Sequence, residues 1–150
     1  MNPGLRLPDV NVLVPLLWPP HMHHKAAQDW FMAVRALGWA TCPITQLGCV
    51  RVLANPAVSH GSLSVGSAVG LLREILSDAH HVFWPDDLAP SDALFAATLP
   101  HVQGHNQVTD RYLLALAASH SGVLATFDRS VGSGLPAASP LFDHLEIIET

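Results

Sequence analysis

The segment GVLATFD, residues 122–128, decides the fold class of this 150-residue chain. It is a short, mostly apolar run that begins at a glycine and ends at Asp128. Such a run is typical of a strand that is buried on both faces of a parallel sheet. The segment directly before it, VTDRYLLALAASHS at 108–121, is apolar nearly all round, which predicts a buried helix. A buried helix that leads into a buried strand indicates an α/β domain.

The rest of the chain continues this alternation of strands and helices. Further strands are expected at 5–8, 38–44, 80–85 and 145–149. Helices are expected at 10–18 and 23–37, after a Thr45 N-cap at 46–53, at 64–78, and after a Ser91 N-cap at 92–99. The segments 55–62 and 100–107 are rich in Pro, Gly, Asn and His, and we interpret them as loops. The alternation predicts a central parallel sheet flanked by helices on both faces.

The composition limits the class of protein. The chain is 49% hydrophobic and 13% charged, and its length suits a single domain over residues 1–150 with a substantial core. Its formal net charge is -5, with six arginines and one lysine, so it lacks the basic surface of a general nucleic-acid binder. Any contact with RNA or DNA must be local, or must be assisted by a metal ion that offsets the acids.

Neither the cysteines nor the apolar N-terminal run indicates export. Cys42 and Cys49 form no CxxC pair, and we expect both to be buried free thiols. The run 10–18 is too short to span a membrane and is followed by PPH rather than by a small-residue cleavage site. We therefore expect a cytoplasmic protein without membrane contact.

Three acidic residues fall where a parallel sheet would bring them together. Asp9 follows the strand at 5–8, and Asp128 ends the strand at 122–128. Asp110 lies in the first turn of the helix at 108–121, just after a candidate N-cap, Thr109. The carboxyl ends of parallel strands share one edge, where such sheets bind ligands, and Asp110 joins that edge if its helix is a crossover.

Carboxylates that converge in this way repel one another and raise one another's pKa unless a cation intervenes. Oxygen ligands suit a hard divalent ion such as Mg²⁺ or Mn²⁺, which can activate water and stabilise charge on a phosphodiester oxygen. Alternatively, Asp9 and Asp110 are ordinary residues at helix N-termini, and Asp128 begins a turn. Spacing alone leaves both interpretations open.

Three segments in the order DVNVLV (9–14), WATCPITQLGCVRVLANP (39–56) and VTDRYLLALAASHSGVLATFDRSV (108–131) resemble PIN domains. They are specifically similar to the VapC toxins of bacterial toxin–antitoxin pairs. The resemblance implies a PIN-like α/β fold, a homodimer and an endoribonuclease that depends on Mg²⁺ or Mn²⁺. It also implies an RNA substrate and a VapB antitoxin, which wraps the toxin, can push a basic residue into the acidic site, and forms a heterotetramer or larger assembly with it.

The resemblance assigns roles to individual residues. Asp9, Asp110 and Asp128 correspond to catalytic, metal-binding acids of the family, and Asn11 to a polar residue that orients the first acid. Gln46 stands where many PIN domains have a glutamate, and a glutamine can hold a water molecule but cannot act as a general base. The departure keeps a second hypothesis open, namely a catalytically weakened module that binds RNA or an antitoxin.

The sequence contains several other candidate patterns. The guanidinium groups of Arg51, Arg111 and Arg129 are the best candidates for RNA-phosphate contacts. The histidines in HMHH (21–24) and at 80–81 lack zinc-ligand spacing, so they do not predict a zinc site. A phosphoacceptor receiver domain is excluded because the only lysine, Lys25, lies in the wrong helix, and a dinucleotide fold is excluded because no GxGxxG follows the first strand.

Overall fold

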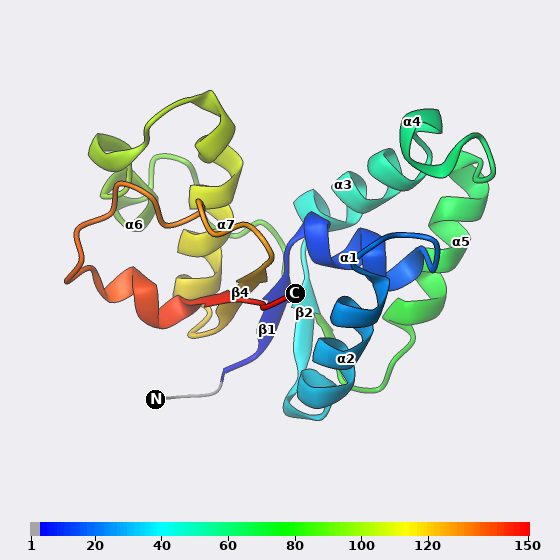
Figure 1. The fold of residues 1–150 in the computed structure, drawn as a ribbon. Coiled ribbons are helices and arrows are strands. Elements are labelled where there is room, and N and C mark those ends of the chain that lie inside the picture. The colour runs from blue at the N-terminus through cyan, green and yellow to red at the C-terminus, as the bar shows by residue number, and fades with distance from the viewer. Residues whose placement is uncertain (1–3) are drawn as a thin grey trace.

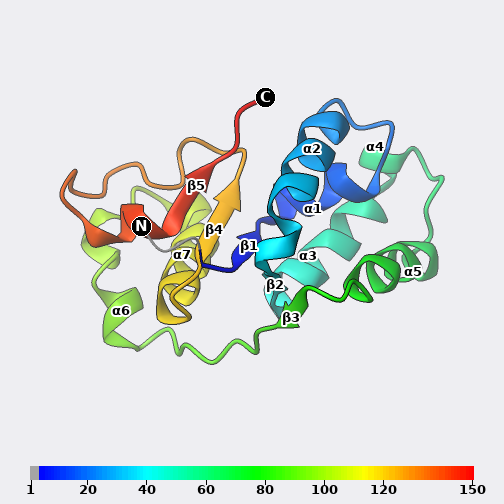
Figure 2. The same cartoon turned by 90° about the horizontal axis from the view of Figure 1, so that it is seen from below.

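The computed structural model describes residues 4–150 and contains a five-stranded sheet in which every pair of neighbouring strands is parallel. The strands are β1 (Arg6–Pro8), β2 (Trp39–Thr41), β3 (His81–Phe83), β4 (Val123–Thr126) and β5 (Leu145–Ile147). Their spatial order is β3-β2-β1-β4-β5 (Figure 2). The predicted parallel α/β fold is therefore confirmed.

Helices cover both faces of this sheet (Figure 1). They are α1 (Val10–Leu17), α2 (His24–Val34), α3 (Pro43–Leu53), α4 (Pro56–Ser59), α5 (Val65–Leu76), α6 (Ala93–Ala96) and α7 (Val108–Ser119). Short 3₁₀ turns occupy Arg35–Leu37, Leu99–His101, His105–Gln107 and Pro140–His144. Within the described part of the chain, no helix is long and apolar enough to cross a membrane.

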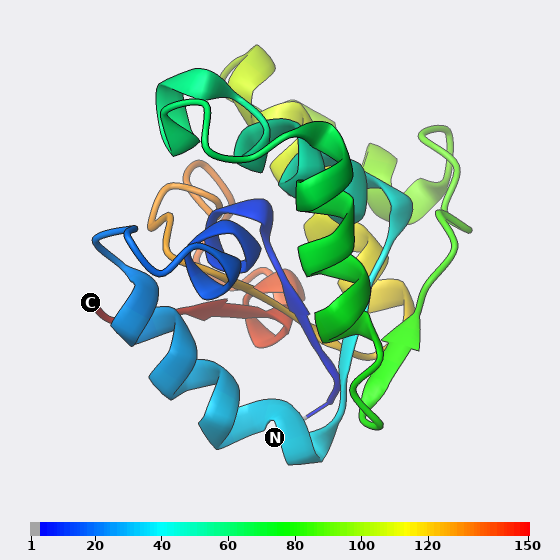
Figure 3. The same ribbon diagram turned by 90° about the vertical axis from the view of Figure 1, so that its right-hand side faces the viewer.

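The sheet separates two hydrophobic cores because successive side chains of a strand point to opposite faces. In β4, Leu124 packs with α7 and Ala125 packs with the helices on the other face. Leu7 of β1 joins the α7 core, whereas Trp39 of β2 joins the core formed by α1, α2, α3 and α5. Figure 3 looks onto the face that this second group of helices covers.

The predicted start of α3 is wrong. The helix begins at Pro43, with Cys42 as the N-cap, because a proline without an N–H fits the first helical position. Thr45 lies within the first turn, where its Oγ1 accepts a hydrogen bond from the backbone N of Cys42 at 3.0 Å. The expected loop at 55–62 contains the short helix α4, which Asn55 caps and Pro56 starts.

Two other predicted caps are also corrected. Asp92, not Ser91, caps α6, because its carboxylate accepts a hydrogen bond from the backbone N of Leu94. Helix α7 starts one residue before Thr109, with Gln107 at the N-cap position, because the 3₁₀ turn at His105–Gln107 runs directly into it. Asp110 nevertheless lies in the first turn of α7, as predicted.

The strand order places a crevice beside the central strand. From β1 the chain proceeds outward through β2 to β3, and it then crosses back to build β4 and β5 on the other side. The carboxyl ends of β1 and β4 are thus a point where the strand order reverses. In open parallel sheets, ligands bind at such points.

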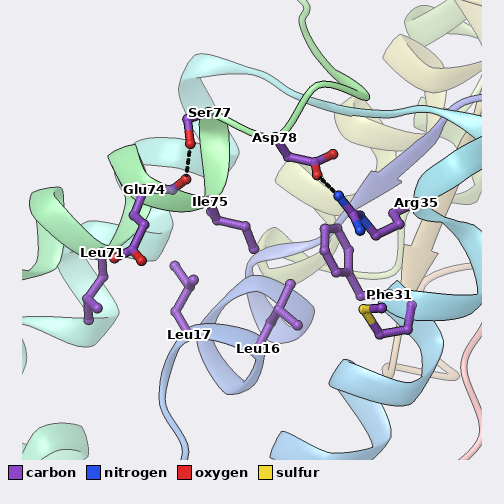
Figure 4. A pocket seen from close by; sticks show the side chains of 10 residues that line it. Leu16, Leu17, Phe31, Arg35, Leu71, Glu74, Ile75, Ser77 and Asp78 are labelled. Carbon is purple, nitrogen blue, oxygen red and sulfur yellow. Dashed lines mark hydrogen bonds and ion pairs between the residues drawn. The ribbon is translucent and has the colours of Figure 1, made fainter.

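The core around α2 is closed at one end by an ion pair, which Figure 4 shows beside an open cavity of about 580 Å³ between α1, α2 and α5. Arg35 donates to Asp78 Oδ1, and Trp39 Nε1 donates to Asp78 Oδ2 at 3.0 Å. The hydrogen bond from Trp39, followed by the bonds from Arg35 and the backbone of His80, lowers the pKa of Asp78 to about 2.

The Asp78→Asn variant is expected to be less stable than the wild type at pH 7 and to lose that difference in acid. The folded pKa of about 2 lies below the ordinary 3.8, so the ionised carboxyl stabilises the fold above about pH 4. This contribution disappears as the pH falls towards 2. Urea unfolding of both proteins at pH 7, 4 and 3 measures the effect, and a difference that stays constant over this range contradicts the assignment.

Candidate active site

Asp9 lies at the crevice and is only 6% exposed. It is the residue after β1 and the N-cap of α1, where its Oδ1 accepts a hydrogen bond from the backbone N of Val10 at 2.7 Å. Its Oδ2 accepts from Thr126 Oγ1 at 3.0 Å. Burial raises the pKa of Asp9 despite these two bonds, and the negative charge of Asp128 raises it further. Asp9 is therefore both a helix cap and a buried acid with a raised pKa.

Thr126 is the last residue of β4, and its hydroxyl connects Asp9 to neighbouring residues. It was not among the site residues predicted from the sequence. While its hydroxyl donates to Asp9, its oxygen accepts from Asn11 Nδ2 at 2.9 Å and from the backbone N of Asp128 at 3.1 Å. Pro8 is in register with Ala125, so Thr126 is level with Asp9. The sequence did contain a signal for Thr126, because it is a polar residue at the end of an otherwise apolar strand and lies two positions before Asp128.

Asn11 reaches the acid indirectly. Its Oδ1 accepts from the backbone N of Phe127 at 3.2 Å, while its Nδ2 donates to Thr126. The side chain therefore joins the first turn of α1 to the segment after β4. Hydrogen bonds through the Thr126 hydroxyl thus link Asn11 to Asp9, and the orienting role of Asn11 stays a prediction.

Asp110 and Asp128 belong to the same electrostatic cluster. Burial raises the pKa of Asp110 to about 6, with further contributions from the charges of Asp9 and Asp128, while Arg111 acts in the opposite direction. Asp128 also begins a turn, because its Oδ1 accepts from the backbone N and the hydroxyl of Ser130 at 2.8 and 2.7 Å. Three acids from three segments thus influence one another, although each also has an ordinary structural position.

The donor set fits a hard divalent cation. Among residues 4–150, no three His, Cys, Asp or Glu side chains are already close enough to enclose an ion. However, each oxygen of Asp9 accepts one hydrogen bond and retains a lone pair. The pKa of Asp110 is raised first by burial and then by the charges of Asp9 and Asp128, and both effects would be offset by a cation. Carboxylate oxygens in this state suit Mg²⁺ or Mn²⁺, which keep several waters in their coordination shells.

Gln46 lies in α3, and its side chain forms a hydrogen bond with the last residue of β2. Its Nε2 donates to Thr41 Oγ1 at 2.9 Å, and the same oxygen lies 2.8 Å from His81 Nε2. A cavity of about 450 Å³ lies against Asp9 and Asp110, and Gln46 is not among its lining residues in the described chain. The water-holding role of Gln46 stays a prediction.

Arg111 does not fit the predicted phosphate contact. Its side chain is buried, with 0% exposure, and its guanidinium donates to three backbone carbonyls, those of Val131 at 2.9 Å, His101 at 3.4 Å and Ser133. A buried guanidinium must be satisfied internally, and this one ties α7 to the loop after β4. The role of Arg111 is therefore corrected to a structural one.

The two other predicted arginines are on the surface. Arg129 is exposed and pairs with Glu149 at 2.5 Å. Arg51 is exposed on α3. An exposed ion pair of this kind contributes little to stability, so Arg129 is free to exchange Glu149 for a phosphate. The RNA-phosphate contacts of Arg51 and Arg129 stay predictions.

A parallel α/β domain with acidic side chains at the carboxyl edge of its sheet is the architecture of PIN domains, and the PIN domain family matches residues 6–132. Curated relatives include Ribonuclease VapC39 of Mycobacterium tuberculosis, which is 44% identical over 129 residues (86% of this chain and 92% of that protein). Ribonuclease VapC38 of the same species is 40% identical over 127 residues (85% and 87%), and Ribonuclease VapC29 is 43% identical over 120 (80% and 83%). The chain belongs to the VapC family of PIN-domain proteins.

Proposed function

We propose that this chain is the toxin of a type II toxin–antitoxin module, an endoribonuclease that requires Mg²⁺ or Mn²⁺. The proposal is supported by the position of Asp9 and Asp110 on one cavity beside the point where the strand order reverses. It is also supported by the pKa of Asp110, which burial and the charges of Asp9 and Asp128 raise to about 6. The similarity to proteins named ribonucleases indicates RNA as the substrate.

The three aspartates would hold the metal ion, and the rest of the site keeps them in place. When bound, the ion supplies an activated water and stabilises negative charge on the phosphodiester. Thr126 fixes one oxygen of Asp9, and the backbone N of Val10 fixes the other. Burial of Asp9 excludes bulk water from this side of the site, which strengthens every electrostatic interaction there.

We further propose a VapB antitoxin as partner, a homodimer, and a heterotetramer or larger assembly with the antitoxin. The chain would act as a single PIN domain over residues 1–150, and the family match to residues 6–132 supports this extent. With a net charge of -5, RNA affinity must come from a few local contacts, for which Arg51 and Arg129 are suitably exposed.

A catalytically weakened module that holds RNA or the antitoxin is the second candidate. It is favoured by Gln46, which lacks a charge and whose amide donates to Thr41. One assay separates the two functions, because only the enzyme produces RNA fragments.

Antitoxin-free protein is expected to cut RNA in the presence of Mg²⁺ or Mn²⁺ and to stop when EDTA removes the ion. Total bacterial RNA is incubated with the protein, and primer extension maps the ends of the fragments. Restoration of the same cuts by added Mn²⁺ is the control. Cutting that continues in EDTA contradicts the metal requirement, and absence of cutting with either ion favours the binding module.

Thr126→Val is expected to lower the cleavage rate about 10- to 100-fold, the usual effect of removing a residue that orients a metal ligand. The substitution keeps the shape of the side chain but leaves Asp9 Oδ2 without its donor. Thr126→Ser retains the hydroxyl and is expected to recover most of the rate. Equal rates for the valine and serine variants contradict the positioning role.

A further inference from the structure

The loop between α1 and α2 carries His21 and His23, and His24 begins α2; the spacing of these histidines did not predict a zinc site. His21 and His23 line the same cavity of about 450 Å³ that Asp9 and Asp110 line. The loop therefore contributes two aromatic rings to the proposed catalytic site. None of the roles assigned so far uses them.

One of these rings is stacked next to the acids. The ring of His23 lies on Phe127, with centroids 5.3 Å apart and an interplanar angle of 29°. Phe127 is the residue between Thr126 and Asp128, so the stack is attached directly to the segment that carries the acid cluster. His21 lies beside His23 at 5.6 Å with a tilt of 40°. Together, His21, His23 and Phe127 form an aromatic shelf on one wall of the cavity.

Hydrogen bonds hold the loop in this position. His24 Nδ1 lies 2.7 Å from the carbonyl oxygen of Pro15 and must donate to it, which anchors the start of α2, and with it the end of the loop, to α1. The backbone N of His23 donates to His21 Nδ1 at 3.0 Å. Neutral His21 therefore carries its proton on Nε2, which can donate to an acceptor on a ligand.

His21 favours its uncharged form, and an uncharged ring does not attract a phosphate as a charged one does. Burial lowers the pKa of His21, and the neighbouring His23 and His24 lower it further. Apart from Asn11 and the acids, the rest of the lining is apolar and includes Val14 and Val52. Flat aromatic rings, apolar walls and a polar donor are the features with which proteins bind an unpaired base of single-stranded RNA.

We propose that the aromatic shelf of His21, His23 and Phe127 is a nucleobase subsite, which holds an unpaired RNA base beside the phosphodiester presented to Asp9 and Asp110. This inference rests on the proposed ribonuclease function for its substrate class. In this proposal, the residues that contact the base come from the α1–α2 loop and from Phe127.

The test measures RNA binding separately from cutting, in the inactive Asp9→Asn background. The probes are fluorescein-labelled ten-nucleotide oligoadenylate, oligouridylate and oligocytidylate, and a duplex of equal length, followed by fluorescence anisotropy. His23→Ala is expected to weaken binding of the best single-stranded probe about tenfold, since loss of one base–aromatic stack has an effect of this order. His23→Phe, which preserves a ring, is expected to restore binding.

Two further variants complete the design. Phe127→Leu keeps apolar volume and removes the ring, so it tests the shelf if His23→Ala lowers the melting temperature. His80→Ala is the matched control, because His80 is exposed and precedes β3, at the amino edge of the sheet away from the acids. We expect the first variant to weaken binding and the second to leave it unchanged.

The outcomes distinguish this inference from the proposed function. If the wild type cuts RNA but neither His23→Ala nor Phe127→Leu changes binding, the subsite is wrong and the enzyme stands. If the wild type cuts nothing but single-stranded binding still depends on His23, the subsite stands and the enzyme is wrong. Equal binding of duplex and single strands, failure of all single-stranded probes to bind, or a His23→Ala defect confined to the antitoxin complex, overturns the nucleobase assignment.

Discussion

Asp9→Asn is expected to lower RNA cleavage by about a thousandfold while the protein stays folded. The asparagine oxygen can still accept the hydrogen bond from the backbone N of Val10, and asparagine is a good N-cap, so α1 remains capped. The variant loses the charge that attracts a divalent ion. A loss of this size corresponds to about 4 kcal/mol of transition-state stabilisation.

The same variant has a second expected phenotype. Burial raises the pKa of Asp9 in the folded protein, so the ionised carboxylate lowers the free energy of unfolding at pH 7, and neutral asparagine removes this cost. Without metal, Asp9→Asn should therefore melt at a higher temperature than the wild type. Added Mn²⁺ should raise the melting temperature of the wild type only, because a ligand stabilises the state that binds it.

Asp29→Asn is the matched control for both measurements. Asp29 is exposed on α2 and pairs with Lys25 at 2.8 Å, so the same chemical change there removes only a surface ion pair. Cleavage and the Mn²⁺-induced shift should both be retained. An Asp9→Asn protein that cuts RNA at the wild-type rate would contradict the assignment of the acid cluster.

Arg111→Met is expected to lower the free energy of unfolding by about 3–5 kcal/mol, a large part of the total for a domain of this size. Methionine fills much of the volume but leaves the carbonyls of His101, Val131 and Ser133 without their charged donor. The melting temperature should fall by roughly 10 °C. Thermal and urea unfolding followed by circular dichroism measure the change.

Arg73→Ala provides the comparison for Arg111, since Arg73 is exposed on α5 and its removal should change stability by less than about 0.5 kcal/mol. A phosphate-contact role would give the opposite pattern: Arg111→Met would weaken RNA binding and leave stability nearly unchanged. The two measurements therefore discriminate between the structural role and the one predicted from sequence.

The fold could be predicted because its decisive elements are strongly patterned. The strand at 122–128 is a bounded apolar run, and Val108–Ser119 is apolar on most sides because α7 is buried. The edge positions of Asp9 and Asp128 followed from the parallel sheet. Helix starts were less predictable, since Thr45 and Thr109 resemble caps locally, while proline and a preceding 3₁₀ turn set the true boundaries.

The site could be predicted only in part, because residue spacing does not show which side chains of different elements meet. Spacing identifies which acids share an edge, but it does not show which hydroxyl lies level with them, and Thr126 became visible only through the register of β1 with β4. Likewise, Arg111 follows a site acid in the sequence, yet a helix turns successive residues by about 100°, so its side chain enters the core instead of the crevice.

The division of the molecule into two cores has a consequence for how it unfolds. Asp9 is attached to the α1 side and Asp110 to the α7 side, so like charges face each other across the junction of two packing units. In the metal-free protein, this repulsion should favour opening at the junction, and amide hydrogen exchange should then be faster at the carboxyl ends of β1 and β4 than in the metal-bound protein. A bound cation would couple the two halves into one cooperative unit, so that exchange in both slows together.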